Sequence, residues 1–169
     1  MSFFQTSSAG GWGSRPATAT TTPNITATTK VAGEQDLEVT PGANDTVSAL
    51  AFSPTADVLA VASWDTFVRI YRIDKTNAQP VQPWQQYQHE GPVLDVCFND
   101  MGTKVISVGA DKGARCFDLN TNQAGVVAQH NDTIRCVRWT RVFGGALVTG
   151  GWDKSVKIWK IEPQPTLIT

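Results

Sequence analysis

The sequence predicts an all-β fold of the β-propeller type. One pattern occurs three times, and each copy carries an aspartate in a short turn between two apolar runs: Asp65, Asp111 and Asp153. These aspartates are 46 and 42 residues apart, and the aromatic residues that close the following apolar runs keep the same intervals: Tyr71, Phe117 and Trp159. A repeat of roughly 40–45 residues with four strands in each unit is typical of propeller blades.

The expected strands follow the repeat in order. We expect blade 1 at about residues 45–87, blade 2 at about 89–128 and blade 3 at about 130–169. Matching inner strands are predicted at Val47–Phe52, Val93–Phe98 and Ile134–Trp139, because each is an apolar run that opens its unit. The remaining strands are predicted at Val58–Ser63, Phe67–Ile73, Val81–Tyr87, Ala146–Thr149, Val156–Trp159 and within Pro165–Thr169, with turns of the second unit at Asn99–Thr103, Ala110–Gly113 and Asp118–Asn122.

The N-terminal region differs from the repeats in composition. Residues 1–35 are rich in Thr, Ser and Gly and poor in aliphatic side chains, so they cannot bury enough apolar surface to offset the entropy of ordering. We expect a disordered tail there and a partial propeller over residues 36–169. The run Asp36–Thr40 alternates polar and apolar residues and predicts one short strand ahead of the first unit.

Composition argues against several classes of function. The chain has 14 Lys and Arg against 15 Asp and Glu, so it lacks a bulk positive field for nucleic acid or membrane surfaces. Its three cysteines, Cys97, Cys116 and Cys136, form no C-x-x-C pair, which argues against a zinc site or a disulfide framework. No paired carboxylates, activated nucleophile or phosphate-binding glycine loop recurs in the repeats. We therefore expect no enzyme activity, metal, cofactor, membrane span or small-molecule substrate.

Residues at fixed offsets in the repeats resemble the WD-repeat family. In that family a histidine, a hydroxyl, a turn aspartate and a tryptophan form a buried hydrogen-bonded chain. The third unit matches in full, with His130, Thr149, Asp153 and Trp159. The second has Phe117 in the tryptophan position and so lacks the indole donor, but keeps His89, Ser107 and Asp111. The first keeps only Asp65, with other residues at the three remaining positions: Ala43, Val61 and Tyr71.

A closer resemblance is to the nucleoporin-docking mRNA export factors of the WD-repeat class. It rests on Asp36–Thr40, Gly91–Cys97 and Gly150–Trp159, taken in that order. It implies a seven-bladed propeller, about three blades of which lie in this chain. It also implies binding of a nucleoporin hairpin called a GLEBS motif and a role in moving messenger ribonucleoprotein out of the nucleus, with locations in the nucleus, nuclear pore and cytoplasm. The alternatives are a spindle-checkpoint adaptor that binds a GLEBS-like motif of a kinase, and a generic WD-repeat scaffold.

Trp64 and Trp152 are the candidate partner-binding residues. Each directly precedes a turn aspartate, where the second unit has Ala110. In the checkpoint family, tryptophans at this position contact the GLEBS segment. The alternative is that these indoles pack against the loop of a neighbouring blade.

A local basic run in the third unit is the one feature that bears on RNA. Arg135, Arg138 and Arg141 could contact RNA directly or could line a solvated channel or rim. Because the chain lacks a basic field, we expect messenger ribonucleoprotein to be reached through partner proteins.

Overall fold

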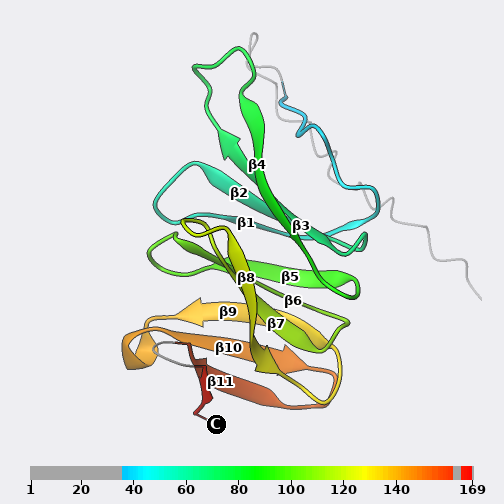
Figure 1. The fold of residues 1–169 in the computed structure, drawn as a ribbon, viewed down its shortest axis with the longest axis vertical. Coiled ribbons are helices and arrows are strands. Elements are labelled where there is room, and N and C mark those ends of the chain that lie inside the picture. Colours follow the sequence, from blue (N-terminus) through cyan, green and yellow to red (C-terminus); the bar gives the residue numbers. More distant parts are fainter. Residues whose placement is uncertain (1–35, 162–164, 169) are drawn as a thin grey trace, which may run out of the picture. The chain divides into compact units, whose positions relative to one another are not determined.

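The computed structural model describes residues 36–161 and 165–168, and in this part of the chain it contains twelve β-strands in three four-stranded antiparallel sheets. Each sheet follows one unit of the repeat in chain order (Figure 1). The predicted disordered tail, residues 1–35, lies outside the described residues.

The first sheet is a meander in which each strand pairs with the next one along the chain. It contains β1 (Val47–Phe52), β2 (Val58–Ser63), β3 (Phe67–Ile73) and β4 (Val81–Gln88). All six residues of β2 are buried, whereas β1 has exposed positions. Pro83 lies in β4, the strand that ends the sheet order, where a residue without an N–H is tolerated.

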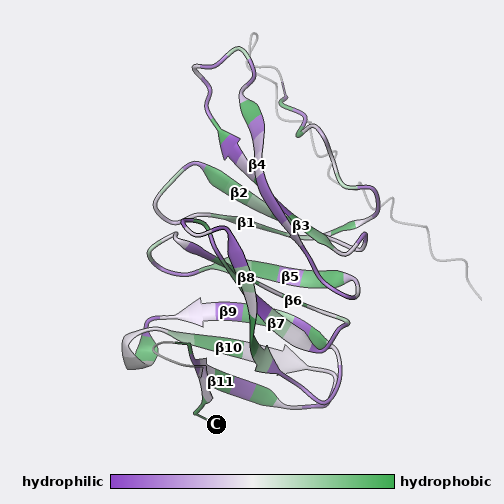
Figure 2. Ribbon diagram, viewed as in Figure 1, coloured by the Kyte–Doolittle hydropathy of each residue, from purple (hydrophilic) through white to green (hydrophobic). Residues whose placement is uncertain are grey.

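The second sheet repeats the same order and is the most buried of the three along its inner strand. It contains β5 (Val93–Phe98), β6 (Lys104–Gly109), β7 (Gly113–Asp118) and β8 (Gln123–Gln129). All six residues of β5 are buried because β5 contacts β1 and β2 of the first sheet as well as β9 of the third. Figure 2 shows the hydrophobic character of β2 and β5 that this position requires.

The third sheet has the order β12-β11-β10-β9 and a short final strand. It contains β9 (Ile134–Thr140), β10 (Ala146–Gly151), β11 (Val156–Lys160) and β12 (Thr166–Leu167). The 3₁₀ turn η1 (Val142–Gly144) connects β9 to β10. It is the one helical segment among the described residues, and this part of the chain offers no helix that could cross a membrane.

Two apolar clusters hold neighbouring sheets together. The first joins the first and second sheets and includes Ile70, Val93 and Phe98. The second joins the second and third sheets and includes Ile106, Val137 and Leu147. Each sheet thus buries one face against its neighbour, as stacked repeats do. The prediction of an all-β, incomplete propeller is confirmed.

The prediction of a strand at Asp36–Thr40 is wrong. This segment has no strand pairing, although the side chain of Val39 packs against a buried cluster of Leu59, Val61 and Tyr71. An alternating pattern becomes a strand only where a sheet edge supplies hydrogen-bond partners, and among the described residues no strand pairs with this segment.

Candidate partner-binding surface

The three turn aspartates hold equivalent backbone groups in all three sheets. Each carboxylate accepts a hydrogen bond from the amide two residues further on, and these amides belong to Phe67, Gly113 and Ser155 at 3.1, 3.3 and 3.1 Å. Each also accepts one from the loop that precedes the inner strand, through the amides of Asn44, Glu90 and Asn131 at 2.8, 3.4 and 3.2 Å. One carboxylate therefore ties two loops of the same sheet together.

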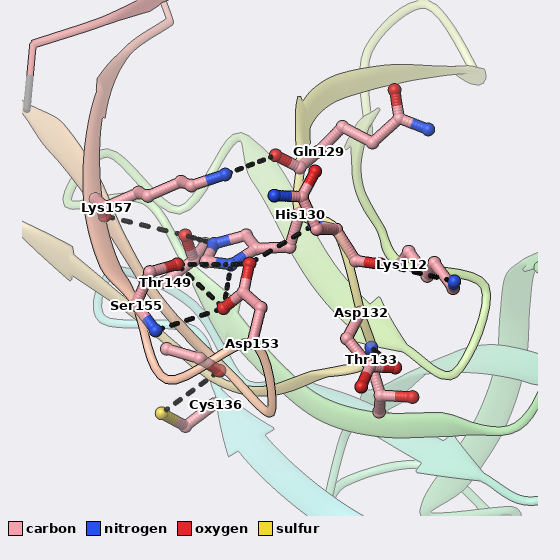
Figure 3. Close-up of polar contacts among 12 residues, drawn as sticks. Lys112, Gln129, His130, Asp132, Thr133, Cys136, Thr149, Asp153, Ser155 and Lys157 are labelled. Atoms are coloured by element: carbon pink, nitrogen blue, oxygen red, sulfur yellow. Dashed lines mark hydrogen bonds and ion pairs between the residues drawn. The ribbon is translucent and has the colours of Figure 1, made fainter.

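In the third sheet this carboxylate belongs to a longer chain of hydrogen bonds (Figure 3). Nδ1 of His130 lies 3.0 Å from Oδ2 of Asp153, and Nε2 lies 2.8 Å from Oγ1 of Thr149. The indole Nε1 of Trp159 donates to the same hydroxyl at 2.9 Å. Because an indole can only donate, Thr149 accepts from Trp159, and the same hydroxyl oxygen contacts Nε2 of His130, so it links the tryptophan to the histidine. Every polar side-chain group of these four residues thus has a hydrogen-bond partner.

The same chain in the second sheet is completed by a residue of the first sheet that the sequence analysis did not identify, Tyr87 of β4. His89 bonds Asp111 through Nδ1 at 2.9 Å and Ser107 through Nε2 at 2.7 Å. The missing indole is replaced by the hydroxyl of Tyr87, which lies 2.7 Å from Oγ of Ser107. The second chain lacks the indole, as the sequence indicated, and the hydroxyl of Tyr87 takes its place as a partner of Ser107.

Tyr87 and Phe117 together occupy the space that one tryptophan fills in the third sheet. Their rings stack with centroids 4.7 Å apart and planes 9° apart. Two residues before His89 lies Tyr87, in β4 of the first sheet, and two residues before His130 lies the buried Ala128, in β8 of the second sheet, which packs in the same cluster as Trp159. The large Tyr87 thus accompanies the smaller Phe117, and the small Ala128 accompanies the larger Trp159.

In the first sheet an arginine takes the place of the absent histidine. The guanidinium of Arg69 lies 2.8 Å from Oδ2 and 3.1 Å from Oδ1 of Asp65. Tyr71, in the position of the tryptophan, donates its hydroxyl to the carbonyl of Pro41 at 2.6 Å. Asp65 therefore has charged and neutral partners, although the rest of the histidine chain is absent here.

These partners shift the pKa values of the turn carboxyls. Burial raises the pKa of Asp65, but hydrogen bonds from Arg69 and from two amides outweigh it and lower the pKa to about 2. At Asp111, burial again acts to raise the pKa. Hydrogen bonds, of which the one from His89 has the largest effect, outweigh burial and lower the pKa. The hydroxyl of Ser155 is the largest influence that lowers the pKa of Asp153. All three carboxyls are therefore held as carboxylates.

Trp64, Ala110 and Trp152 occupy equivalent places beside these turns. Their amides donate to the carbonyls of the residues that precede the three inner strands, Thr46, Pro92 and Thr133, at 2.9, 2.9 and 2.8 Å. The backbone at these three positions is thus fixed in the same way, and the positions differ in the size of the side chain.

The two tryptophans line one hollow that draws residues from all three sheets. The hollow has a volume of about 350 Å³ and is lined by Ser48, Trp64, Pro92, Leu94, Ala110, Thr133, Arg135 and Trp152. Trp64 is 52 % exposed and Trp152 is 61 % exposed. Such exposure leaves a large part of both indoles in contact with solvent rather than with a neighbouring loop.

The three arginines of the basic run have different surroundings. Arg135 lies on the tryptophan hollow, and its Nη1 is 3.5 Å from the carbonyl of Leu94. Arg138 pairs with Asp95 at 2.6 Å, and Arg141 lies 3.8 Å from Asp100. Arg138 and Arg141 thus lie beside carboxylates, on a different hollow of about 430 Å³ that includes Phe52 and Trp139.

Among the described residues there is no candidate metal site and no disulfide bond. In this part of the chain no group of three or more His, Cys, Asp or Glu side chains is placed to hold a metal ion. Cys97, Cys116 and Cys136 are thiols rather than disulfide partners. Burial raises the pKa of the Cys97 thiol to about 12, which disfavours the nucleophilic thiolate.

The pairing of Tyr87 with Phe117 generates a test of the hydrogen-bonded chain. Tyr87→Ala is expected to lower the free energy of unfolding by about 3 kcal/mol, because it leaves a cavity and removes a hydrogen-bond partner of the Ser107 hydroxyl. Adding Phe117→Trp should recover about half of that loss, since an alanine and a tryptophan, Ala128 and Trp159, occupy the equivalent positions around the chain of the third sheet. Urea unfolding of both single variants and the double variant measures the coupling. Additive losses would contradict this account of the pair.

The lowered pKa of Asp65 generates a test by pH. Because the folded-state pKa of about 2 lies below the unfolded value of about 3.9, the stabilisation is complete above pH about 4 and is lost as the pH falls towards 2. Asp65→Asn should therefore cost about 1–2 kcal/mol at pH 6, after allowance for solvent screening, and almost nothing at pH 2. Urea unfolding from pH 2 to pH 6 measures the difference, and a constant difference across this range would be inconsistent with the lowered pKa.

Comparison with known proteins agrees with the repeats and the sheet topology. Residues 50–142 match the family described as the anaphase-promoting complex subunit 4 WD40 domain. The chain is 41 % identical over 155 residues to the poly(A)+ RNA export protein of Schizosaccharomyces pombe, a match that covers 90 % of this chain and 42 % of that protein.

Two further relatives carry similar names. The chain is 44 % identical over 144 residues to mRNA export factor GLE2 of Chaetomium thermophilum, covering 82 % of this chain and 40 % of the relative. It is 44 % identical over 110 residues to the mRNA export factor of Danio rerio, covering 63 % and 29 %. The chain thus spans about two fifths of the length of the first two relatives, and on the repeats, the sheets and the family match it belongs to the WD40-repeat family.

Proposed function

We propose that this chain acts as a non-enzymatic adaptor in mRNA export and that its tryptophan hollow binds a GLEBS-like hairpin of a nucleoporin. The observation that carries the proposal is the pair of exposed indoles, Trp64 and Trp152, on one hollow. Relatives that share 41–44 % of aligned residues are named for RNA export, which supports the process. The resemblance to the nucleoporin-docking family supports the partner.

The physical case rests on what two exposed indoles offer to a partner. Tryptophan supplies a large, rigid contact area with few rotatable bonds, and it is enriched among residues that dominate binding energy. Trp64 and Trp152 project from turns that carboxylates tie to the neighbouring loops, so their backbones need little ordering on binding. A hairpin laid across the hollow would therefore bury both rings at a small entropic cost.

In this proposal the chain contacts messenger ribonucleoprotein indirectly, through other proteins. Arg138 lies beside Asp95 and Arg141 beside Asp100, so these two cations are not aligned as a phosphate-binding surface. RNA is then reached through protein partners, and the sites of action are the nucleus, the nuclear pore and the cytoplasm.

Alanine substitution of either tryptophan tests the proposal. Trp64→Ala and Trp152→Ala should each weaken binding of a synthetic nucleoporin GLEBS hairpin by about 30-fold, which corresponds to about 2 kcal/mol. Isothermal titration with the full chain measures the affinity, and melting curves should change little because both rings are more than half exposed. Phe52→Ala is the matched control, since Phe52 is an aromatic residue with 64 % exposure that lies on the other hollow.

Three outcomes would contradict the proposal. The hairpin could fail to bind the unsubstituted chain, both tryptophan variants could bind as the unsubstituted chain does, or Phe52→Ala could weaken binding as much as they do. If the corresponding hairpin of a checkpoint kinase binds and the nucleoporin hairpin does not, the checkpoint adaptor is the better description.

A further inference from the structure

Ala110 lies between two tryptophans at the equivalent position of the repeat. The hollow exists there because the second sheet supplies a methyl group where the first and third supply indoles. We propose that Ala110 and Arg135 form a specificity subsite that takes an aliphatic side chain of the bound hairpin with a carboxylate next to it. This inference rests on the proposed function and names the part of the hairpin that this surface selects.

The apolar half of the subsite is defined by its lining. Pro92, Leu94 and Ala110 come from the second sheet, and Trp64 and Trp152 come from the sheets on either side of it. Leu94 is buried, so its side chain is already held in place before a ligand arrives. A side chain without polar atoms can bury its surface here without leaving a donor or acceptor unpaired.

The charged half of the subsite is Arg135. It is the one ionisable residue among those that line the hollow, and its hydrogen bond to the carbonyl of Leu94 is long, at 3.5 Å. A guanidinium carries five N–H donors in a planar fork that fits a carboxylate. By contrast, Asp95 already holds Arg138 at 2.6 Å. Charge complementarity therefore favours an Asp or Glu of the partner beside Arg135.

The backbone shows that a larger residue can be accommodated at position 110. Ala110, Trp64 and Trp152 each donate an amide hydrogen bond to the carbonyl that precedes an inner strand, at 2.9, 2.9 and 2.8 Å. The turn that follows Ala110 also has the same left-handed residue as the others, with φ of 74°, 64° and 66° at Thr66, Lys112 and Lys154. A tryptophan at position 110 would thus keep the turn while its ring fills the hollow.

The test combines substitutions in the chain with substitutions in the synthetic nucleoporin hairpin. Ala110→Trp should weaken binding by at least about tenfold without changing the melting curve, and the control Phe52→Trp, which puts an indole on the other hollow, should bind as the unsubstituted chain does. Arg135→Gln should also weaken binding by about tenfold and reduce its salt dependence. Its control is Arg141→Gln, because Arg141 is exposed and lies on the other hollow.

The hairpin itself identifies the residue that enters the subsite. Each aliphatic residue of the hairpin is replaced by alanine and each acidic residue by its amide. We expect one aliphatic substitution that costs affinity with the unsubstituted chain and costs nothing further with Ala110→Trp. We likewise expect one acidic substitution that costs nothing further with Arg135→Gln.

The outcomes separate this inference from the proposed function. If the hairpin binds and Trp64→Ala weakens it, but Ala110→Trp and Arg135→Gln bind as the unsubstituted chain does, the subsite is wrong and the proposed function stands. If the hairpin does not bind the unsubstituted chain, both are overturned. If Ala110→Trp lowers the melting temperature, Arg135→Gln decides between the outcomes. Coupling between Arg135→Gln and one acidic substitution of the hairpin supports the subsite, and the absence of coupling overturns it.

Discussion

The carboxylate of each turn aspartate connects the interior of a blade to the surface that it presents. It binds an amide in its own turn and an amide in the loop before the inner strand, and in the second and third blades it also binds a histidine. The position of Trp152, one residue before Asp153, follows from these bonds. A buried polar chain in the blade thereby fixes the backbone position of the exposed Trp152.

The side chains that surround the turn aspartate differ from blade to blade. The third blade uses Trp159 and Thr149, the second uses its own Ser107 together with Tyr87 from β4 of the first, and the first uses an ion pair with Arg69. All three solutions hold the carboxylate ionised, because each supplies donors that outweigh the cost of burial. The turn geometry therefore depends on satisfying one carboxylate rather than on one particular set of residues.

Much of the fold could be predicted from the sequence because propeller blades repeat at a fixed interval. The spacing of the turn aspartates located the strands, and the family pattern located His130 and its partners. Tyr87 could not be found in this way, since it lies outside the four family positions. It reaches Ser107 of the second sheet from β4 of the first, a contact between stacked sheets that sequence spacing does not describe. A comparison of residue sizes two positions before each histidine would have shown that Tyr87 faces Phe117 where Ala128 accompanies Trp159.

The candidate site was predicted in part for a similar reason. Its position in the repeat placed Trp64 and Trp152 on the same side of their blades, but the hollow between them depends on Ala110, Leu94 and Arg135, which no motif marks. The strand predicted at Asp36–Thr40 was wrong because an alternating pattern records which side chains are apolar and not whether a sheet edge is available to pair with them.

Amide hydrogen exchange on Asp153→Ala is the most direct measurement of whether a turn carboxylate fixes the surface. Asp153 is the acceptor for the amides of Asn131 and Ser155, so both amides should exchange faster in the variant, while the strand amides of β6 in the second blade should keep their protection. Unchanged exchange at Asn131 and Ser155 in a folded variant would contradict the account, because the loops around Trp152 would then be held by something other than this carboxylate.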